Sequence, residues 1–208
     1  MVALTIDDGP SEFTEEILQI LKANDVSATF FIIGSHITPE REGVLQDLIR
    51  NKCELANHAM HDEPSWRLSD SDLIDQIQSA QTLITDAYIA ANSTPSPLTG
   101  SLGGPDQLPT PKYYFRPGSG VFTTRMRKVL SLLGYKLVMG SIYPHDAYIS
   151  SWRINLWHIL SLLAPGGIII CHDGRSWTIP MLKRLLPELK RRGYRVVTLS
   201  ELLDQAQT

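Results

Sequence analysis

Short apolar runs alternate with amphipathic stretches along nearly the whole chain. Runs rich in β-branched and aromatic residues, such as 26–33, predict buried strands, whereas apolar residues three and four positions apart predict helices. The clearest helix follows Ser69, a residue type that caps helix N-termini, and carries an apolar stripe from Leu73 to Ala87. The predicted strands cover 2–6, 26–33, 53–57, 113–115, 136–141, 167–171 and 195–198. The predicted helices begin at 14, 39, 69, 124, 152, 179 and 200.

Strands that are separated by helices imply parallel pairing with right-handed crossovers. Seven strands are enough to close an irregular barrel, so we expect a single α/β domain over 1–208, a distorted (β/α)7-type barrel. An open doubly wound sheet is the alternative. The pattern stops at 92–112, where five prolines and three glycines predict a long, mobile loop at the rim.

The composition is that of a globular protein, with 43% hydrophobic and 20% charged residues in 208. A net charge of -3 provides no basic footprint for nucleic acid or an anionic membrane, so a neutral substrate fits better. No apolar window is long enough for a transmembrane helix. Two cysteines are too few for a disulfide scaffold.

The first residues already predict a strand rather than a secretory leader. We therefore expect either an intracellular protein or, if the chain was trimmed, a secreted or cell-wall-associated one. The sequence leaves the compartment and the oligomeric state open.

Polar side chains follow four of the predicted strands, which is where parallel α/β folds place their chemistry. Helical spacing would pair His58 with Asp62 at i+4, or with His61 at i+3. Carboxylate and imidazole groups with open positions are typical of a catalytic divalent-metal site. The four groups are Asp7-Asp8-Gly9, the set Glu54, Asn57, His58, His61 and Asp62, the run Arg116 to Gly120, and His172-Asp173-Gly174.

These motifs resemble those of the polysaccharide deacetylases, the chitin and peptidoglycan deacetylases of carbohydrate esterase family 4. The resemblance extends over 3–203, apart from the 92–112 loop. The matching segments are Thr5-Ile6-Asp7-Asp8-Gly9-Pro10, Ala28-Thr29-Phe30-Phe31, Glu54-Leu55-Ala56-Asn57-His58, Arg116 to Gly120, His172-Asp173 and Gly193 to Leu202.

The resemblance implies hydrolysis of N-acetyl groups on an N-acetylglucosamine polymer such as chitin. It also implies a divalent metal, zinc before cobalt or another divalent ion. By that likeness, Asp7 is the general base and His172 the general acid, with Arg116 and Asp146 orienting them. Asp8, His58 and Asp62 are the implied metal ligands. The Ser119 backbone N–H would stabilise the oxyanion, and Tyr143 would contact substrate.

The chain departs from the family pattern at three places. Asp62 stands where the family has a second histidine, and His61, one residue earlier, is the alternative ligand. The fourth motif reads Tyr143-Pro144-His145-Asp146-Ala147 and lacks its first Asp and its Trp, and Gly118-Ser119 replaces Pro-Tyr. With Asp62, the ligand set would carry two negative charges, which weakens a bound ion as a Lewis acid.

Two other functions therefore stay open beside the deacetylase. One is a catalytically weakened carbohydrate-binding protein on the same fold, and the other is an amide or imide hydrolase that acts on a small molecule. Trp66, Tyr143 and Trp177 are candidates for stacking on a sugar ring, with ordinary core packing as the alternative.

Overall fold

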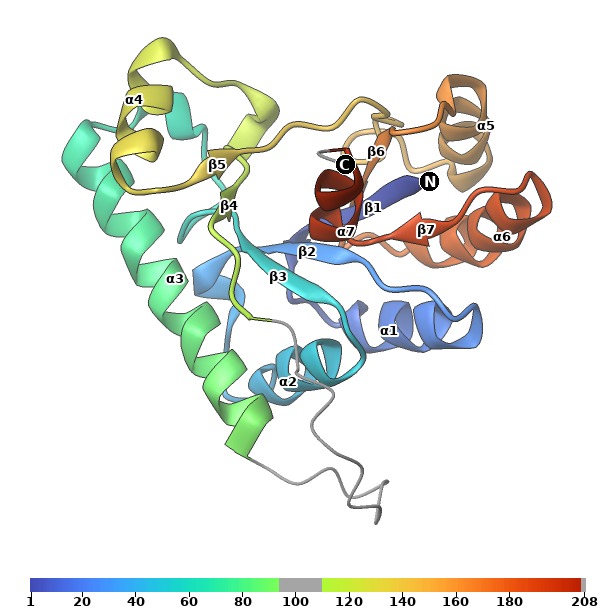
Figure 1. Cartoon of the computed structure of the whole chain (residues 1–208), viewed down its shortest axis with the longest axis horizontal. Coiled ribbons are helices and arrows are strands. Elements are labelled where there is room, and N and C mark those ends of the chain that lie inside the picture. The colour runs from blue at the N-terminus through green and yellow to red at the C-terminus, as the bar shows by residue number, and fades with distance from the viewer. Residues whose placement is uncertain (94–109, 207–208) are drawn as a thin grey trace.

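The computed structural model describes residues 1–93 and 110–206. Seven strands form one curled sheet, and all pairings between them are parallel (Figure 1). The strands are β1 (Val2–Gly9), β2 (Thr29–Ile32), β3 (Glu54–Asn57), β4 (Tyr114–Phe115), β5 (Lys136–Leu137), β6 (Ile168–His172) and β7 (Val196–Val197).

The sheet curls without closing fully. Its order is β5-β4-β3-β2-β1-β6, and β7 pairs with the start of β1. Among the described residues, a single bridge between Ile142 and Ile169 joins the segment after β5 to β6. The expected single-domain (β/α) architecture is confirmed in the form of a half-barrel. The predicted strand 136–141 is reduced to β5, Lys136–Leu137, where it pairs with β4. The chain then crosses the seam, the gap between β5 and β6, to the bridge at Ile142.

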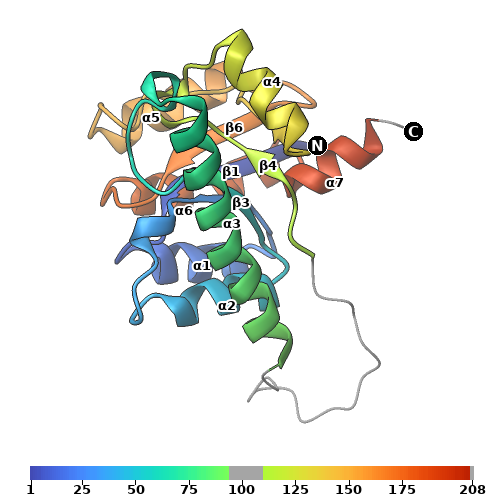
Figure 2. The ribbon, with the colours of Figure 1, turned by 90° about the vertical axis from the view of Figure 1, so that its left-hand side faces the viewer.

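Helices follow the strands in the predicted order. Most of them cover the outer face of the sheet, whereas the last, α7 (Leu199–Gln205), lies on its inner side (Figures 1 and 2). The predicted N-cap at Ser69 is confirmed, because its Oγ accepts the Asp72 backbone N–H at 3.1 Å. The α-helices are α1 (Thr14–Ala23), α2 (Glu42–Arg50), α3 (Asp70–Ser93), α4 (Thr124–Leu132), α5 (Trp152–Leu162), α6 (Thr178–Arg191) and α7 (Leu199–Gln205). The 3₁₀ turns are η1 (Gly34–His36), η2 (Ser65–Arg67) and η3 (Gly118–Gly120).

Strand alternation separates the packing core from the interior of the half-barrel. Phe30 packs in the main core between sheet and helices, whereas its neighbour Phe31 packs with Tyr114 and Leu199 in a separate cluster. The start of α7 is tied to that interior, since the Leu199 backbone N–H donates to Thr29 Oγ1 at 2.8 Å. The functional side chains described below lie on the same inner side, at the opposite ends of the strands.

Glu54, one of the polar residues noted in the sequence, is a structural residue at the start of β3. Its carboxylate accepts from the Thr29 hydroxyl at 2.9 Å and from the Ser200 backbone N–H at 3.2 Å. It therefore fastens α7 to the sheet and lies away from the site.

Among residues 1–93 and 110–206, none of the helices has both the length and the apolar character that a membrane crossing requires. Most of the predicted 92–112 loop lies outside the described residues.

Candidate active site

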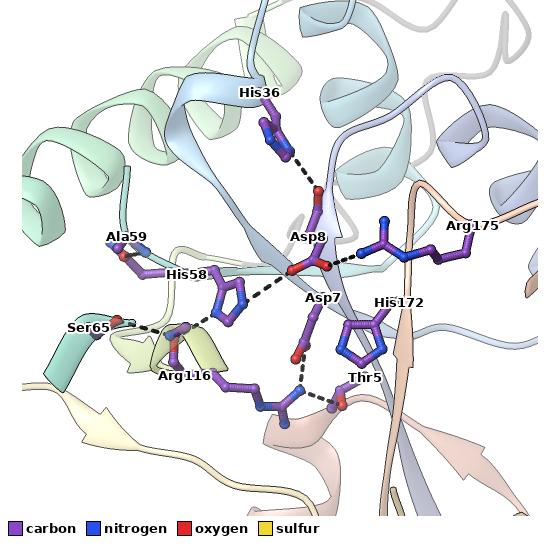
Figure 3. A network of polar contacts seen from close by, with 12 residues as sticks. Thr5, Asp7, Asp8, His36, His58, Ala59, Ser65, Arg116, His172 and Arg175 are labelled. Atoms are coloured by element: carbon purple, nitrogen blue, oxygen red, sulfur yellow. Dashed lines mark hydrogen bonds and ion pairs between the residues drawn. The ribbon is translucent and has the colours of Figure 1, made fainter. Parts of the chain in front are cut away.

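The carboxyl ends of β1, β3 and β6 bring the predicted catalytic groups together. Asp7 and Asp8 come from the end of β1, His58 directly follows β3, and His172 ends β6. Their side chains gather in one space, with Arg116 reaching in from the segment after β4 (Figure 3). Because parallel strands end at one edge of a sheet, the strand-end rule brings together residues that are far apart in the sequence.

A bulge in β1 lets two adjacent carboxylates serve one site. Regular alternation would send Asp7 and Asp8 to opposite faces of the sheet. The pairing with β2 shifts register between Asp7 and Gly9, and Asp8 adopts a left-handed backbone with φ of 69°. The bulge re-aims Asp8, as bulges beside active sites commonly do.

Asp7 is held by a buried arginine. Arg116 Nη1 donates to Asp7 Oδ1 at 2.5 Å and to the Thr5 hydroxyl at 2.8 Å. Both partners of the ion pair are almost completely buried, and the Arg116 guanidinium lies 4.0 Å from the Phe31 ring centroid. This ion pair fixes the orientation of the Asp7 carboxylate.

Asp8 and His58 present the donors of a metal site. His58 Nε2 lies 3.4 Å from Asp8 Oδ1, while its Nδ1 lies 2.7 Å from the Arg116 carbonyl oxygen. The carbonyl can only accept, so Nδ1 carries the proton and Nε2 is left to face Asp8. A carbonyl on the far nitrogen is the usual way in which a ligating imidazole is oriented, so this pair fits a divalent ion.

Burial and charge act against each other on this pair. Burial disfavours the charged forms, but the hydrogen bond between the two side chains and the charges around them outweigh it. The pKa of Asp8 is therefore lowered and the pKa of His58 is raised.

Among the described residues, no contact joins the third predicted ligand to this pair. Asp62 and His61 are both exposed, and neither has a hydrogen bond or ion pair to Asp8 or His58 in the described part of the chain. No group of three His, Cys, Asp or Glu side chains in that part is arranged to hold a metal. The second oxygen of Asp8 is instead 3.5 Å from Arg175 Nη2. The choice between Asp62 and His61 stays a prediction.

His172 and Asp146 form a second buried pair in the site, joined by two contacts. Asp146 Oδ1 lies 2.7 Å from His172 Nδ1, and its other oxygen accepts the His172 backbone N–H at 2.8 Å. Burial alone would lower the pKa of His172. The hydrogen bond and charge of Asp146, together with the charges of Asp7 and Asp8, raise it to about 9. The ring is thus suited to carry a proton at neutral pH and to donate it from Nε2.

The structure places one of the two predicted substrate-contacting residues, Tyr143, at the site, and shows no such contact for the other, Ser119. Tyr143 lies edge-on to His172, with ring centroids 5.9 Å apart, so it lies at the site. Ser119 is exposed in η3 with a left-handed φ of 62°. No described contact joins Ser119 to Asp7 or His172, and its oxyanion role stays a prediction.

The two tryptophans proposed for sugar stacking also differ. Trp66 is 41% exposed, whereas the Trp177 indole donates to the Asp146 carbonyl at 2.9 Å. Trp177 therefore supports the loop that carries Asp146.

Three residues for which no role was predicted from the sequence contact the site. Thr5 lies two positions before Asp7, and strand alternation could have placed it on the same face. Arg175 and His36 each follow the end of a strand, and the strand-end rule could have found both. His36 Nδ1 lies 2.8 Å from the Asp8 carbonyl oxygen and so supports the bulge (Figure 3).

A cavity of about 630 Å³ lies away from these residues, at the seam between β5 and the start of β6. Its walls come from α4, β5 and α7, and include Phe122, Leu137 and Leu199. The chemistry of the molecule is at the strand ends, so this cavity is not the catalytic site.

The sequence profile of the polysaccharide deacetylase family matches residues 1–100. A peptidoglycan-N-acetylglucosamine deacetylase from Bacillus cereus is 29% identical over 98% of this chain and 88% of its own length. The chain spans only 30% of the length of a bifunctional xylanase/deacetylase from Pseudobutyrivibrio xylanivorans.

Solved structures show the same fold. The CE4 domain of a multidomain xylanase from the hindgut metagenome of Trinervitermes trinervoides superposes with a TM-score of 0.83 at 28% identity, covering 100% of this chain and 91% of that one. A Bacillus anthracis protein described as a CE4 family pseudoenzyme gives 0.79 at 26% identity, with 98% and 65% covered. The sequence match, the fold and the strand-end residues thus agree in their similarity to the polysaccharide deacetylases.

Proposed function

We propose that this chain is a divalent-metal-dependent hydrolase that removes N-acetyl groups from N-acetylglucosamine-containing polysaccharide, such as chitin or its oligomers. The observation that carries the proposal is a set of two oriented proton carriers beside Asp8 and His58. Asp7 is held by Arg116, and His172 is held by Asp146. The Bacillus cereus relative, named for N-acetylglucosamine, supports the choice of sugar.

Asp7 is the proposed general base. Amide hydrolysis needs a group that takes a proton from the attacking water, and a carboxylate can do so only while it is ionised. The contact with Arg116, at 2.5 Å, fixes the orientation of the Asp7 carboxylate in the site. Asp8, its neighbour on the bulge, is then the ligand carboxylate.

His172 is the proposed general acid. An amine is a poor leaving group unless it gains a proton as the C–N bond breaks. The contact of Nδ1 with Asp146 leaves Nε2 to give that proton, and the raised pKa keeps it in place at neutral pH. One proton passes to Asp7 from water and one from His172 to nitrogen, and the products are acetate and a free amine.

Asp8 and His58 would hold the divalent ion, with Asp62, or His61 in its place, completing the set. The bound ion supplies a Lewis acid for the acetyl carbonyl and lowers the pKa of water. We propose zinc as the ion. The Ser119 backbone N–H would supply a second donor to the oxyanion. The neutral substrate agrees with the small net charge of -3.

A second candidate is a carbohydrate-binding protein of weakened or lost activity. The exposed positions of Asp62 and His61 favour it, as does the similarity to a structure described as a pseudoenzyme. In that case, the chain would still bind N-acetylglucosamine oligomers but would not turn them over.

Acetate release from N-acetylglucosamine oligomers distinguishes the two candidates. The protein is assayed after chelation, after zinc is restored, and with cobalt in its place. Deacetylation that is lost on chelation and regained with zinc supports the hydrolase. Oligomer binding by calorimetry without acetate release under any of these conditions would establish the weakened protein instead. An acetylated xylan and a small cyclic imide serve as alternative substrates.

A further inference from the structure

A continuous row of rings runs from the catalytic edge to the outside of α5. Tyr143, beside His172, lies edge-on to His145 at a centroid distance of 4.7 Å. His145 stacks on His158 at 5.3 Å with an interplanar angle of 13°, and Trp157 lies 6.4 Å further on at 23°. This row thereby joins residues from β6, from the loop after β5 and from α5.

The outer end of this row is not part of the core. The buried residues of α5 are Asn155 and Ile159, one turn apart, and they mark its inward face. Trp157, two positions from Asn155, points away from that face and is 69% exposed. Tyr148, on the loop that carries His145, is 83% exposed. Both aromatic side chains are therefore presented to solvent.

The loop holds His145 in a backbone conformation that residues other than glycine rarely adopt. Its φ is 64°, in the left-handed region, and its carbonyl accepts the backbone N–H groups of Tyr148 and Ile149 at 3.0 and 2.9 Å. Such conformations persist where the surroundings impose them, and they cluster at binding sites. Here the turn places the His145 ring between Tyr143 and His158.

We propose that Tyr143, His145, His158 and Trp157 form an extended subsite for the sugar units that flank the acetyl group being removed. The proposal rests on the proposed function, because it takes the polysaccharide as the ligand. A pyranose ring presents a C–H face to an aromatic ring and hydroxyls to N–H and O–H groups at ring edges, and this row supplies both. The row carries no carboxylate, which suits an uncharged sugar polymer. Because the row begins beside His172, the sugar units that it binds would directly adjoin the unit that loses its acetyl group.

The test measures how the effect of a variant changes with substrate length. We expect kcat/KM of the wild type to rise from the N-acetylglucosamine dimer to the hexamer. In Trp157→Ala, the loss should grow with length, from about twofold on the dimer to about tenfold on the hexamer. Trp157→Phe should recover most of it. Leu132→Ala is the matched control, since Leu132 is 88% exposed on α4, away from the row.

Direct binding separates this proposal from the proposed function. Hexamer binding is measured by calorimetry on the wild type and on Trp157→Ala, with no turnover needed. Weaker binding in Trp157→Ala supports the subsite even if the protein releases no acetate. Equal hexamer binding in the two proteins, or an equal loss of kcat/KM at every length, overturns the subsite while leaving the deacetylase proposal standing.

Discussion

The two halves of the site differ in how completely the chain assembles them. On the acid side, Asp146 is fully buried and binds both the ring and the backbone N–H of His172 at 2.7 and 2.8 Å. On the metal side, Asp8 is 3.4 Å from His58 and 3.5 Å from Arg175, and the proposed third ligand is exposed.

The difference follows from what each half must do. A proton donor needs a fixed tautomer and orientation, and hydrogen bonds within the protein provide both. Metal ligands are separated by the ion that they share, so they need not contact one another. The firm contact on the metal side is the one that faces away from the ion, between His58 Nδ1 and the Arg116 carbonyl at 2.7 Å.

The largest effects should come from removing the proton carriers. Asp7→Asn and His172→Ala should each lower kcat by about 10²- to 10⁴-fold, because one step loses its base and the other its acid. Acetate release under zinc-saturated conditions measures both. Asp86→Asn, on the exposed side of α3, is the control. Near-normal turnover in either variant would remove that residue from the mechanism.

The metal half is tested by zinc affinity. Calorimetry on the chelated protein should show binding about 10- to 100-fold weaker in Asp62→Ala, since a ligand is lost, and close to wild type in His61→Ala. The reverse order would make His61 the ligand. If both variants bind zinc like the wild type, neither residue completes the set.

The acid half is tested by pH. With the pKa of His172 raised to about 9, activity should fall as pH rises through that value, because the donor loses its proton. Asp146→Asn removes the negative charge that raises the pKa of His172, so this alkaline limb should move to lower pH. The kcat profiles of the two proteins are compared, and coincident limbs would contradict the role of Asp146.

The same pair contributes to stability with a defined sign. A folded pKa above the ordinary histidine value of 6.5 means that protonated His172 is favoured by folding. Its contribution is fully present below pH 6.5 and disappears as pH rises through about 9. Urea unfolding of wild type and Asp146→Asn across this range measures it.

The smallest effect is expected from Arg175→Gln. The Arg175–Asp8 pair is partly exposed and long, and such pairs contribute about 0–1 kcal/mol. Removing the guanidinium leaves Asp8 free for the ion, so zinc affinity should rise by up to about fivefold. Arg175→Lys should stay close to wild type, and weaker zinc binding in Arg175→Gln would give Arg175 a different role.

The sequence predicted the order of the elements and the strand ends that meet at the site, because both depend on hydrophobic periodicity and on parallel topology. It placed Asp7, Arg116 and His172 together for the same reason. The exact boundaries of individual strands were less well predicted, as at β5, since the pairing of the following segment with β6 is a tertiary effect.

The motifs did not predict two features of the site: the row of rings from Tyr143 to Trp157 and the contact between Arg175 and Asp8. Both join segments whose spacing in the sequence carries no periodic signal. The position of Asp62 was also beyond prediction, because continuous alignment with a motif fixes a residue's register and leaves open where its side chain points.

The β1 bulge makes two different chemical tasks depend on one backbone torsion. Asp8 holds a φ that asparagine and aspartate tolerate better than most residues do, so the position restricts backbone as well as ligand chemistry. A β-branched residue at position 8 would disfavour this backbone conformation, and a regular strand there would also change the direction of the neighbouring Asp7 carboxylate. Damage at this one position would thus spread to both carboxylates.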